Sequence, residues 1–301
     1  MKNTLVVLPG PTGVGKTGFA IELAIRLGCS IISCDSRQIY REMKIGTAAP
    51  DAGQLARVKH HFVGFLSVTD YYSVSRFERD VMALLPSLFN ENPVVVMTGG
   101  SMLYMDAVCR GMDDIPDTDP LVRQKYIDMY RTEGVSGLRL ALKILDPDHY
   151  ARVDLRNPRR IMRALEITES TGRPYSAFLS ATVRERDFRI IKAGLTRERG
   201  ELYRRIDLRV DDMLKKGLEE EAASLAGYRG LNALNTVGYR EMFSYFDGTI
   251  TREQAAALIR RNTRRYARKQ LTWWNRDSEI NWFDASDSDR IISWIESRLE
   301  L

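Results

Sequence analysis

Short apolar runs alternate with helical patterns over the first 110 residues. Continuous apolar runs, which are typical of buried strands, lie at Thr4–Leu8, 30–34 and 93–97. Between the first two, Lys16–Leu27 has apolar residues at helical spacing, and a second helical pattern covers residues 75–89. Strands separated by helices predict a parallel sheet with right-handed crossovers.

The pattern changes at about residue 113. A polar, proline-containing stretch covers residues 113–120, and helical patterns without a strand follow to about residue 184. A strand pattern returns at 188–195. Helical patterns then cover 197–225, 252–274 and 288–299, with an edge strand at 280–283. We therefore expect an α/β core formed by residues 1–112 and 185–301, interrupted by an all-helical insertion domain at 113–184.

A phosphate-binding motif directly follows the first predicted strand. Residues 10–17 read Gly-Pro-Thr-Gly-Val-Gly-Lys-Thr, match G-x-x-x-x-G-K-[ST] and open a helix. Backbone N–H groups of such a loop converge on phosphate oxygens, and the helix dipole favours an anion there. The motif predicts a P-loop-type core whose di- or triphosphate is held by Gly10, Pro11, Thr12, Gly13, Val14, Gly15, Lys16 and Thr17.

One acidic residue stands at a strand end near this loop. P-loop enzymes that hydrolyse nucleotides usually carry a metal-binding Asp after another strand, but here residues 94–97 are followed by Thr-Gly-Gly-Ser. Asp35 follows the second strand, and the carboxyl ends of parallel strands face the ligand crevice. We interpret Asp35 as a general base or metal ligand; the alternative is a helix N-cap.

Positive charge is concentrated on two predicted helices. Residues 254–276 contain seven basic residues and no acidic one, and residues 152–163 contain five arginines and one aspartate. These segments carry net charges of +7 and +4, which leaves −6 for the rest of a chain of net charge +5. A solvated helix face usually mixes both signs. We therefore favour contact with a nucleic-acid backbone, and a folded RNA suits such helices at least as well as a DNA groove.

Composition excludes several other classes. A chain of 301 residues with 44% hydrophobic and 28% charged residues is ordinary for a packed protein. Three cysteines without a CxxC pair exclude a disulfide scaffold and a four-cysteine zinc site. No apolar run is long enough to span a membrane, so we expect no membrane partner and a cytoplasmic protein. Adjacent His60 and His61 would point to opposite faces of a strand, which favours structural roles for both.

The succession of motifs resembles the tRNA dimethylallyltransferases over nearly the whole chain. The shared segments, in order, are the phosphate loop, Ile32-Ser33-Cys34-Asp35-Ser36-Arg37-Gln38-Ile39-Tyr40, Ile45-Gly46-Thr47-Ala48, His60-His61, Tyr72-Ser73, Gly99-Gly100-Ser101, Asn157-Pro158-Arg159-Arg160 with Arg163-Ala164-Leu165-Glu166, Thr171-Gly172-Arg173-Pro174, Val237-Gly238-Tyr239-Arg240-Glu241 and residues 263–273. The Cys/His finger of eukaryotic relatives is missing, which implies the bacterial form.

This resemblance implies a reaction and a set of site residues. A dimethylallyl group would pass from dimethylallyl diphosphate to the exocyclic 6-amino group of an adenosine beside the anticodon of tRNA, with Mg²⁺, releasing diphosphate. The implied catalytic residues are Asp35, Lys16, Thr17, Ser101 and Arg205, with Thr17 also on Mg²⁺. The residues expected to contact the tRNA anticodon stem-loop are Asp35, Ser36, Arg37, Gln38, Ser101, Arg123, Arg159, Arg160, Ile161, Met162, Arg163, Val237, Gly238, Tyr239, Arg240, Arg264, Arg265 and Arg268. We expect a monomer.

Two other functions remain open on the sequence alone. A P-loop kinase for a nucleoside or small metabolite would explain the phosphate loop and Asp35, but not the two basic helices. A non-catalytic RNA-binding ATPase switch would need metal-binding and switch carboxylates that the sequence does not place. Binding of tRNA separates the prenyltransferase from the kinase, and turnover of ATP separates it from the switch.

Overall fold

The computed structural model describes residues 2–113, 115–116, 118–179 and 184–299. It divides into two compact units, one formed by Met1–Cys109 with Arg186–Leu301 and the other by Arg110–Glu185. The sequence placed these boundaries at 113 and 184, and part of that predicted insertion (114, 117 and 180–183) lies outside the described residues. No described helix is both long and apolar enough to cross a bilayer.

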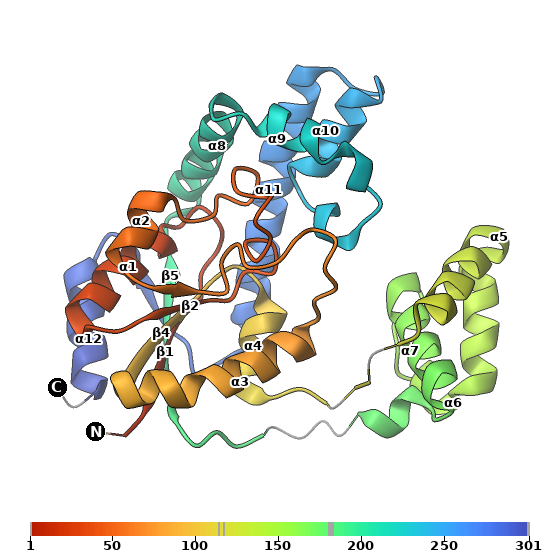
Figure 1. The fold of residues 1–301 in the computed structure, drawn as a ribbon, viewed down its shortest axis with the longest axis horizontal. Coiled ribbons are helices and arrows are strands. Elements are labelled where there is room, and N and C mark those ends of the chain that lie inside the picture. Colours follow the sequence, from red (N-terminus) through yellow and green to blue (C-terminus); the bar gives the residue numbers. More distant parts are fainter. Residues whose placement is uncertain (1, 114, 117, 180–183, 300–301) are drawn as a thin grey trace. The chain divides into compact units, whose positions relative to one another are not determined.

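The first unit is built on a six-stranded, wholly parallel sheet (Figure 1). The strand order is β3-β2-β4-β1-β5-β6. The strands are β1 (Thr4–Leu8), β2 (Ile31–Ser33), β3 (His60–His61), β4 (Val94–Thr98), β5 (Arg189–Thr196) and β6 (Asn281–Asp284). The predicted α/β class is confirmed. The two-residue β3 was not predicted, because two histidines carry no apolar strand signal.

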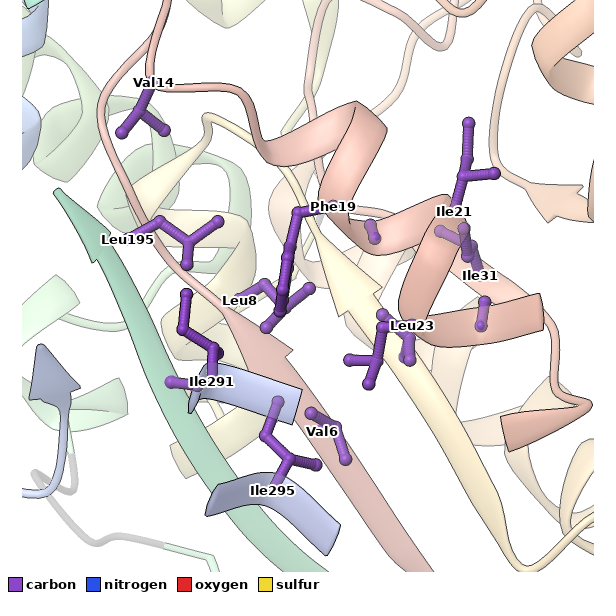
Figure 2. Packing of buried hydrophobic residues seen from close by; sticks show 14 of the residues in the cluster. Val6, Leu8, Val14, Phe19, Ile21, Leu23, Ile31, Leu195, Ile291 and Ile295 are labelled. Atoms are coloured by element: carbon purple, nitrogen blue, oxygen red, sulfur yellow. The ribbon is translucent and has the colours of Figure 1, made fainter. Parts of the chain in front are cut away.

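Helices cover both faces of this sheet, and β1 shows why. Successive strand residues point to opposite faces. Val6 and Leu8 therefore join a buried cluster with α1 (Lys16–Leu27) and α12 (Ser288–Leu299). Figure 2 shows Val6 and Leu8 beside Phe19, Ile291 and Ile295. Leu5 and Val7 face the opposite cluster, which contains residues of α3 (Val74–Glu91), α4 (Met102–Arg110) and the buried Trp274. A continuous apolar run is what a strand buried on both faces requires.

A further group of helices in the first unit packs around its own apolar cluster. It comprises α8 (Arg199–Lys215), α9 (Leu218–Ser224), α10 (Tyr239–Phe246) and α11 (Arg252–Trp274), while α2 (Ala52–Arg57) lies outside it. The sequence predicted one helix over 197–225, and this was wrong. Gly217 has φ 98°, a left-handed conformation that favours glycine, and the chain turns there between α8 and α9.

Every regular element among the described residues of the second unit is a helix or a helical turn. It contains α5 (Pro120–Leu145), α6 (Pro147–Tyr150), α7 (Pro158–Thr171) and a 3₁₀ turn at Tyr175–Phe178. Helices α5 and α7 bury Tyr126, Leu138 and Leu142 against Ile161 and Leu165. Helix α7 begins at Pro158 behind the Asn157 cap, whose side chain accepts a hydrogen bond from the Arg160 N–H, and proline is favoured at the first position of a helix.

Candidate active site

The phosphate loop connects β1 to α1. Gly13 and Gly15 have φ values of 84° and 111°, so both positions favour glycine. The Lys16 ammonium folds back over the loop and donates to the carbonyls of Gly10 (2.7 Å) and Pro11 (2.9 Å). Burial, assisted by the positive charge of Arg209, lowers the pKa of Lys16 to about 8. A partly buried cation held by carbonyls, beside backbone N–H groups at a helix N-terminus, is suited to bind a phosphate anion.

Two arginines of the β5–α8 region contact the loop, and a third lies near Lys16. Arg205 donates through Nε to the Gly13 carbonyl (2.9 Å), and Arg197 donates through Nε to the Val14 carbonyl (2.9 Å). Arg209 lies one helical turn after Arg205 and donates to the carbonyl of Thr47 (3.2 Å). The sequence pointed only to Arg205, by resemblance. Arg197 and Arg209 carried no local signal, because their proximity to the loop depends on the packing of α8.

Asp35 lies in the turn that follows β2. Its Oδ1 accepts hydrogen bonds from the N–H groups of Arg37 (2.9 Å) and Gln38 (3.4 Å). Asp35 therefore caps a turn and not a helix, so the helix N-cap of the alternative interpretation is not formed, and its second oxygen is directed elsewhere. A methyl group added at Gly100 would lie 3.1 Å from Asp35 Oδ2. The carboxylate thus faces the end of β4, and its electrostatic coupling to Lys16 places it near the phosphate loop.

The turn after β4 is held tightly against the turn after β2. Ser101 is buried; its Oγ accepts from the Ser36 N–H (2.8 Å) and donates to Ser36 Oγ (2.8 Å). A Cβ at Gly99 would lie 2.4 Å from the Cys34 carbonyl carbon, so only glycine fits there. The structure brings Ser101 beside the Asp35 turn, where the resemblance expected it.

The Asp35 turn is also tied to the loop that precedes α2. Gln38 donates to the carbonyls of Thr47 (3.3 Å) and Ala48 (3.2 Å). Glu221 of α9 accepts hydrogen bonds from the three consecutive N–H groups of residues 44–46. The Tyr239 hydroxyl donates to the same carboxylate (2.6 Å). Glu221 was missed by sequence analysis because a single glutamate on a helix is indistinguishable from a solvated one.

Among the tRNA contacts predicted for the first unit, the one at Tyr239 was wrong, and the structure shows how its neighbours and Arg37 lie. Tyr239 is fully buried and its hydroxyl is bonded to Glu221, so its side chain cannot contact RNA. Its neighbour Arg240 is exposed, Val237 is half-buried and Gly238 is buried with φ 100°. Arg37 donates to the Asn232 carbonyl (2.8 Å).

The basic face of α11 is partly neutralised by α8. Arg264 lies 3.5 Å from Asp207, and Arg260 pairs with Asp211. Arg268 donates to the Tyr203 hydroxyl (3.3 Å). Arg261 and Arg265 are exposed, and the described part of the chain gives them no ion pair. Counting charges along the α11 segment alone could not show that two aspartates of α8 lie beside its basic face.

In the second unit, most predicted tRNA contacts lie on the surface of α5 and α7. Arg123, Arg159 and Arg160 are exposed. Arg163 is half-buried and lies 3.7 Å from the buried Glu166, and Met162 packs partly against the apolar cluster. Ile161 is fully buried in that cluster, so its predicted contact with RNA was wrong. Its place in the arginine-rich motif reflects packing of the helix.

The donors near the phosphate loop are compatible with a phosphate-bound Mg²⁺. Thr17 is the second residue of α1, and Asp35 is the nearby carboxylate. The described residues contain no group of three or more His, Cys, Asp or Glu that could hold a metal by themselves. Magnesium commonly binds through one or two protein oxygens together with phosphate oxygens and water.

The adjacent histidines His60 and His61 form the short strand β3. The ring nitrogen Nδ1 of His60 lies 2.8 Å from the Val58 carbonyl oxygen.

The fold and this site define a P-loop-type α/β protein with a strand-end carboxylate near the phosphate cradle. The chain belongs to the IPP transferase family, whose model matches residues 38–277. It is 57% identical over 281 residues to tRNA dimethylallyltransferase 2 of Porphyromonas gingivalis, covering 93% of this chain and 94% of the relative. It is 50% identical to tRNA dimethylallyltransferase 1 of Bacteroides fragilis, covering 99% of both chains.

Two solved structures support the fold assignment. The tRNA isopentenylpyrophosphate transferase of Bacillus halodurans is 35% identical, with a TM-score of 0.72 and coverage of 99% of this chain and 97% of that one. A eukaryotic dimethylallyltransferase acting on tRNA has a TM-score of 0.80 and covers 99% of this chain and 77% of that one. At 23% identity, the second comparison bears on the fold alone. The family membership confirms the resemblance seen in the sequence.

Proposed function

We propose that this chain transfers a dimethylallyl group from dimethylallyl diphosphate to the exocyclic 6-amino group of an adenosine beside the anticodon of tRNA. The observation that carries the proposal is the pairing of a phosphate cradle with a nearby carboxylate that stands at the end of β2. Family membership favours this reaction over the kinase alternative. The relatives' names supply the tRNA substrate and the transferred group, and the site supplies suitable chemistry for both.

The phosphate loop serves the leaving group. As the allylic C–O bond breaks, its electron pair goes to the diphosphate oxygen, where negative charge grows. Lys16 and the backbone N–H groups of the loop stabilise that charge, and Arg205 lies beside the loop. Bound Mg²⁺, with Thr17 as a ligand, would add positive charge at the same place. Stabilisation that increases toward the transition state accelerates the reaction rather than merely tightening binding.

Asp35 serves the nucleophile. The lone pair of the adenine 6-amino group is delocalised into the ring, so the amine attacks weakly until it loses a proton. As the C–N bond forms, Asp35 accepts that proton through the oxygen that does not cap the turn. The adenosine must leave the stacked loop to reach a carboxylate at the sheet edge, which costs least in single-stranded RNA.

The arginine faces are proposed to bind tRNA phosphates. Replacing Arg159, Arg160, Arg264 or Arg268 with Ala should weaken tRNA binding and reduce the slope of log affinity against log salt by about 0.7 to 0.9 for each lost contact. Because Arg264 and Arg268 also contact α8, a change at exposed Arg265 is the cleaner test on that helix. Titrations of labelled tRNA at several salt concentrations measure the slope. An unaltered slope in all variants would place the RNA surface elsewhere.

The reaction should not need ATP. The N–H groups and the lysine of a phosphate loop can bind any polyphosphate, so ATP should act at most as a weak competitor of dimethylallyl diphosphate. Hydrolysis of ATP requires an oriented water and groups aimed at the terminal phosphate. Prenyl transfer requires only that the diphosphate be held while the C–O bond breaks. Prenylation of tRNA is measured with and without ATP, together with phosphate release. An absolute ATP requirement, or ATP hydrolysis stimulated by tRNA without prenylated product, would instead favour the kinase or the ATPase switch.

A further inference from the structure

A fully buried glutamine bridges two parts of the active site that are far apart in the chain. Gln270 of α11 has 0% of its surface exposed. Its Oε1 accepts a hydrogen bond from the backbone N–H of Thr12 in the phosphate loop (2.8 Å). Its Nε2 donates to the carbonyl of Gly100 in the turn after β4 (2.8 Å). One side chain thus ties the ends of β1 and β4 together.

The two partners require an amide in this orientation. The Thr12 N–H needs an acceptor and the Gly100 carbonyl needs a donor, and a side-chain amide presents both. The Gly100 carbonyl also receives the Tyr266 hydroxyl (2.8 Å), one helical turn earlier on α11. The Tyr266 hydroxyl interacts with Gly100 and with the Gln270 side chain, whereas Gln270 holds Gly100 and the phosphate loop together. A side chain that only filled the core would not need both contacts.

The Gly100 end of the bridge lies at the catalytic carboxylate. A methyl group placed on Gly100 would lie 3.1 Å from Asp35 Oδ2 and 3.1 Å from Gln270 Nε2. The Thr12 end lies in the loop that would hold the diphosphate. The bridge therefore spans the path between the place where the C–O bond breaks and the place where the amine loses its proton.

We propose that Gln270 is a positioning residue that fixes the spacing between the diphosphate loop and the Asp35 carboxylate. This inference rests on the proposed prenyl transfer, in which both ends of the site act on one short allylic group. A misplacement of about 1 Å between reacting groups can lower a rate about 10²-fold. The contribution of Gln270 is therefore expected in the rate of the bound complex more than in the affinity for tRNA.

The test compares single-turnover transfer by the full-length protein and its variants. Gln270→Met keeps the length of the side chain and loses both hydrogen bonds, so its rate constant should fall about 10²-fold while the reaction still runs to full amplitude. Gln254→Met is the matched control, since that exposed amide also binds backbone but at the far end of α11. Tyr266→Phe removes one of the two donors to Gly100 and should lower the rate less than Gln270→Met does.

A conservative variant separates positioning from folding. Gln270→Glu always offers an acceptor to Thr12, but it offers a donor to Gly100 only when protonated, and burial raises the pKa of such a carboxyl. Its rate, divided by that of the unaltered protein, should therefore fall as pH rises. The side chains of Lys16, Cys34, Asp35 and Tyr266 lie near the bridge in both proteins, so the ratio of the two rates removes the effects that they share. This variant decides the question if Gln270→Met does not fold.

Three outcomes would overturn the inference. They are a Gln270→Met rate constant within threefold of the unaltered protein, a loss of amplitude at an unchanged rate constant, or a pH-independent ratio for Gln270→Glu. Failure of the unaltered protein to prenylate tRNA would instead contradict the proposed function. Calorimetry with inorganic diphosphate then decides on Gln270: weaker binding by Gln270→Met than by Gln254→Met supports the bridge, and equal binding rejects it.

Discussion

Replacing Asp35 with Asn should nearly abolish prenyl transfer while leaving tRNA affinity within a few fold. The amide oxygen of Asn can still accept from the Arg37 and Gln38 N–H groups, so the turn after β2 should keep its shape. What is lost is the proton acceptor for the adenine amine. General-base catalysis contributes roughly 10²–10⁴ in rate, and a loss in that range is expected.

Single-turnover kinetics at saturating tRNA and dimethylallyl diphosphate measure this loss directly. Asp35→Ala is the informative companion, because it removes both the base and the cap of the turn. If capping were the only role of Asp35, Asp35→Asn would be near normal and Asp35→Ala defective. A near-normal rate for Asp35→Asn would remove the general-base assignment.

Replacing Lys16 with Ala should impair both the binding of the diphosphate and its departure. The ammonium lies over the phosphate loop, where it would contact an oxygen whose charge grows in the transition state. Removing one such stabilising donor commonly lowers a catalytic rate by about 10²–10³. Steady-state kinetics should show a higher KM for dimethylallyl diphosphate together with a lower kcat. Lys59→Ala, at an exposed position outside the loop, is the control.

The lowered pKa of Lys16 adds a pH dependence with a definite sign. Because its pKa is about 8, the side chain loses its proton as pH rises through that value, and only the charged form attracts the diphosphate. Binding of the anion raises this pKa. The advantage of the unaltered protein over Lys16→Ala in affinity for inorganic diphosphate should therefore be largest below pH 8 and decrease above it. Calorimetric titrations between pH 7 and 9 measure it, and a constant advantage would contradict the role of the charge.

Local patterns predicted the parts of the site that are contiguous in sequence. The apolar run of β1, the glycines of the loop and the start of α1 lie within residues 4–27, so one segment predicted both the fold and the phosphate cradle. Asp35 was predicted because parallel strands end on the same edge of the sheet. Its capping role and its proposed catalytic role use different oxygens, which no sequence pattern distinguishes.

The parts that the sequence missed depend on contacts between distant segments. Gln270 lies 258 residues after its partner Thr12, and Glu221 lies more than 170 residues after the loop that it holds. Their single polar side chains give no periodic signal. The same limitation explains Ile161 and Tyr239, which belong to recognisable motifs but are buried where their helices pack. A motif identifies a segment, whereas burial decides which of its side chains can meet a ligand.

The most direct test of the central claim is nucleoside analysis of tRNA after incubation with the pure protein, dimethylallyl diphosphate and Mg²⁺, without ATP. The substrate is tRNA that lacks the modification. After the reaction the tRNA is digested, and its nucleosides are separated and identified by mass. The proposed reaction predicts an adenosine that carries one dimethylallyl group on its 6-amino nitrogen, that ribonuclease fragments of the same tRNA place beside the anticodon, and that Asp35→Asn forms at a much lower rate. Unchanged nucleosides at saturating substrate, or a modified nucleoside of any other kind, would contradict it.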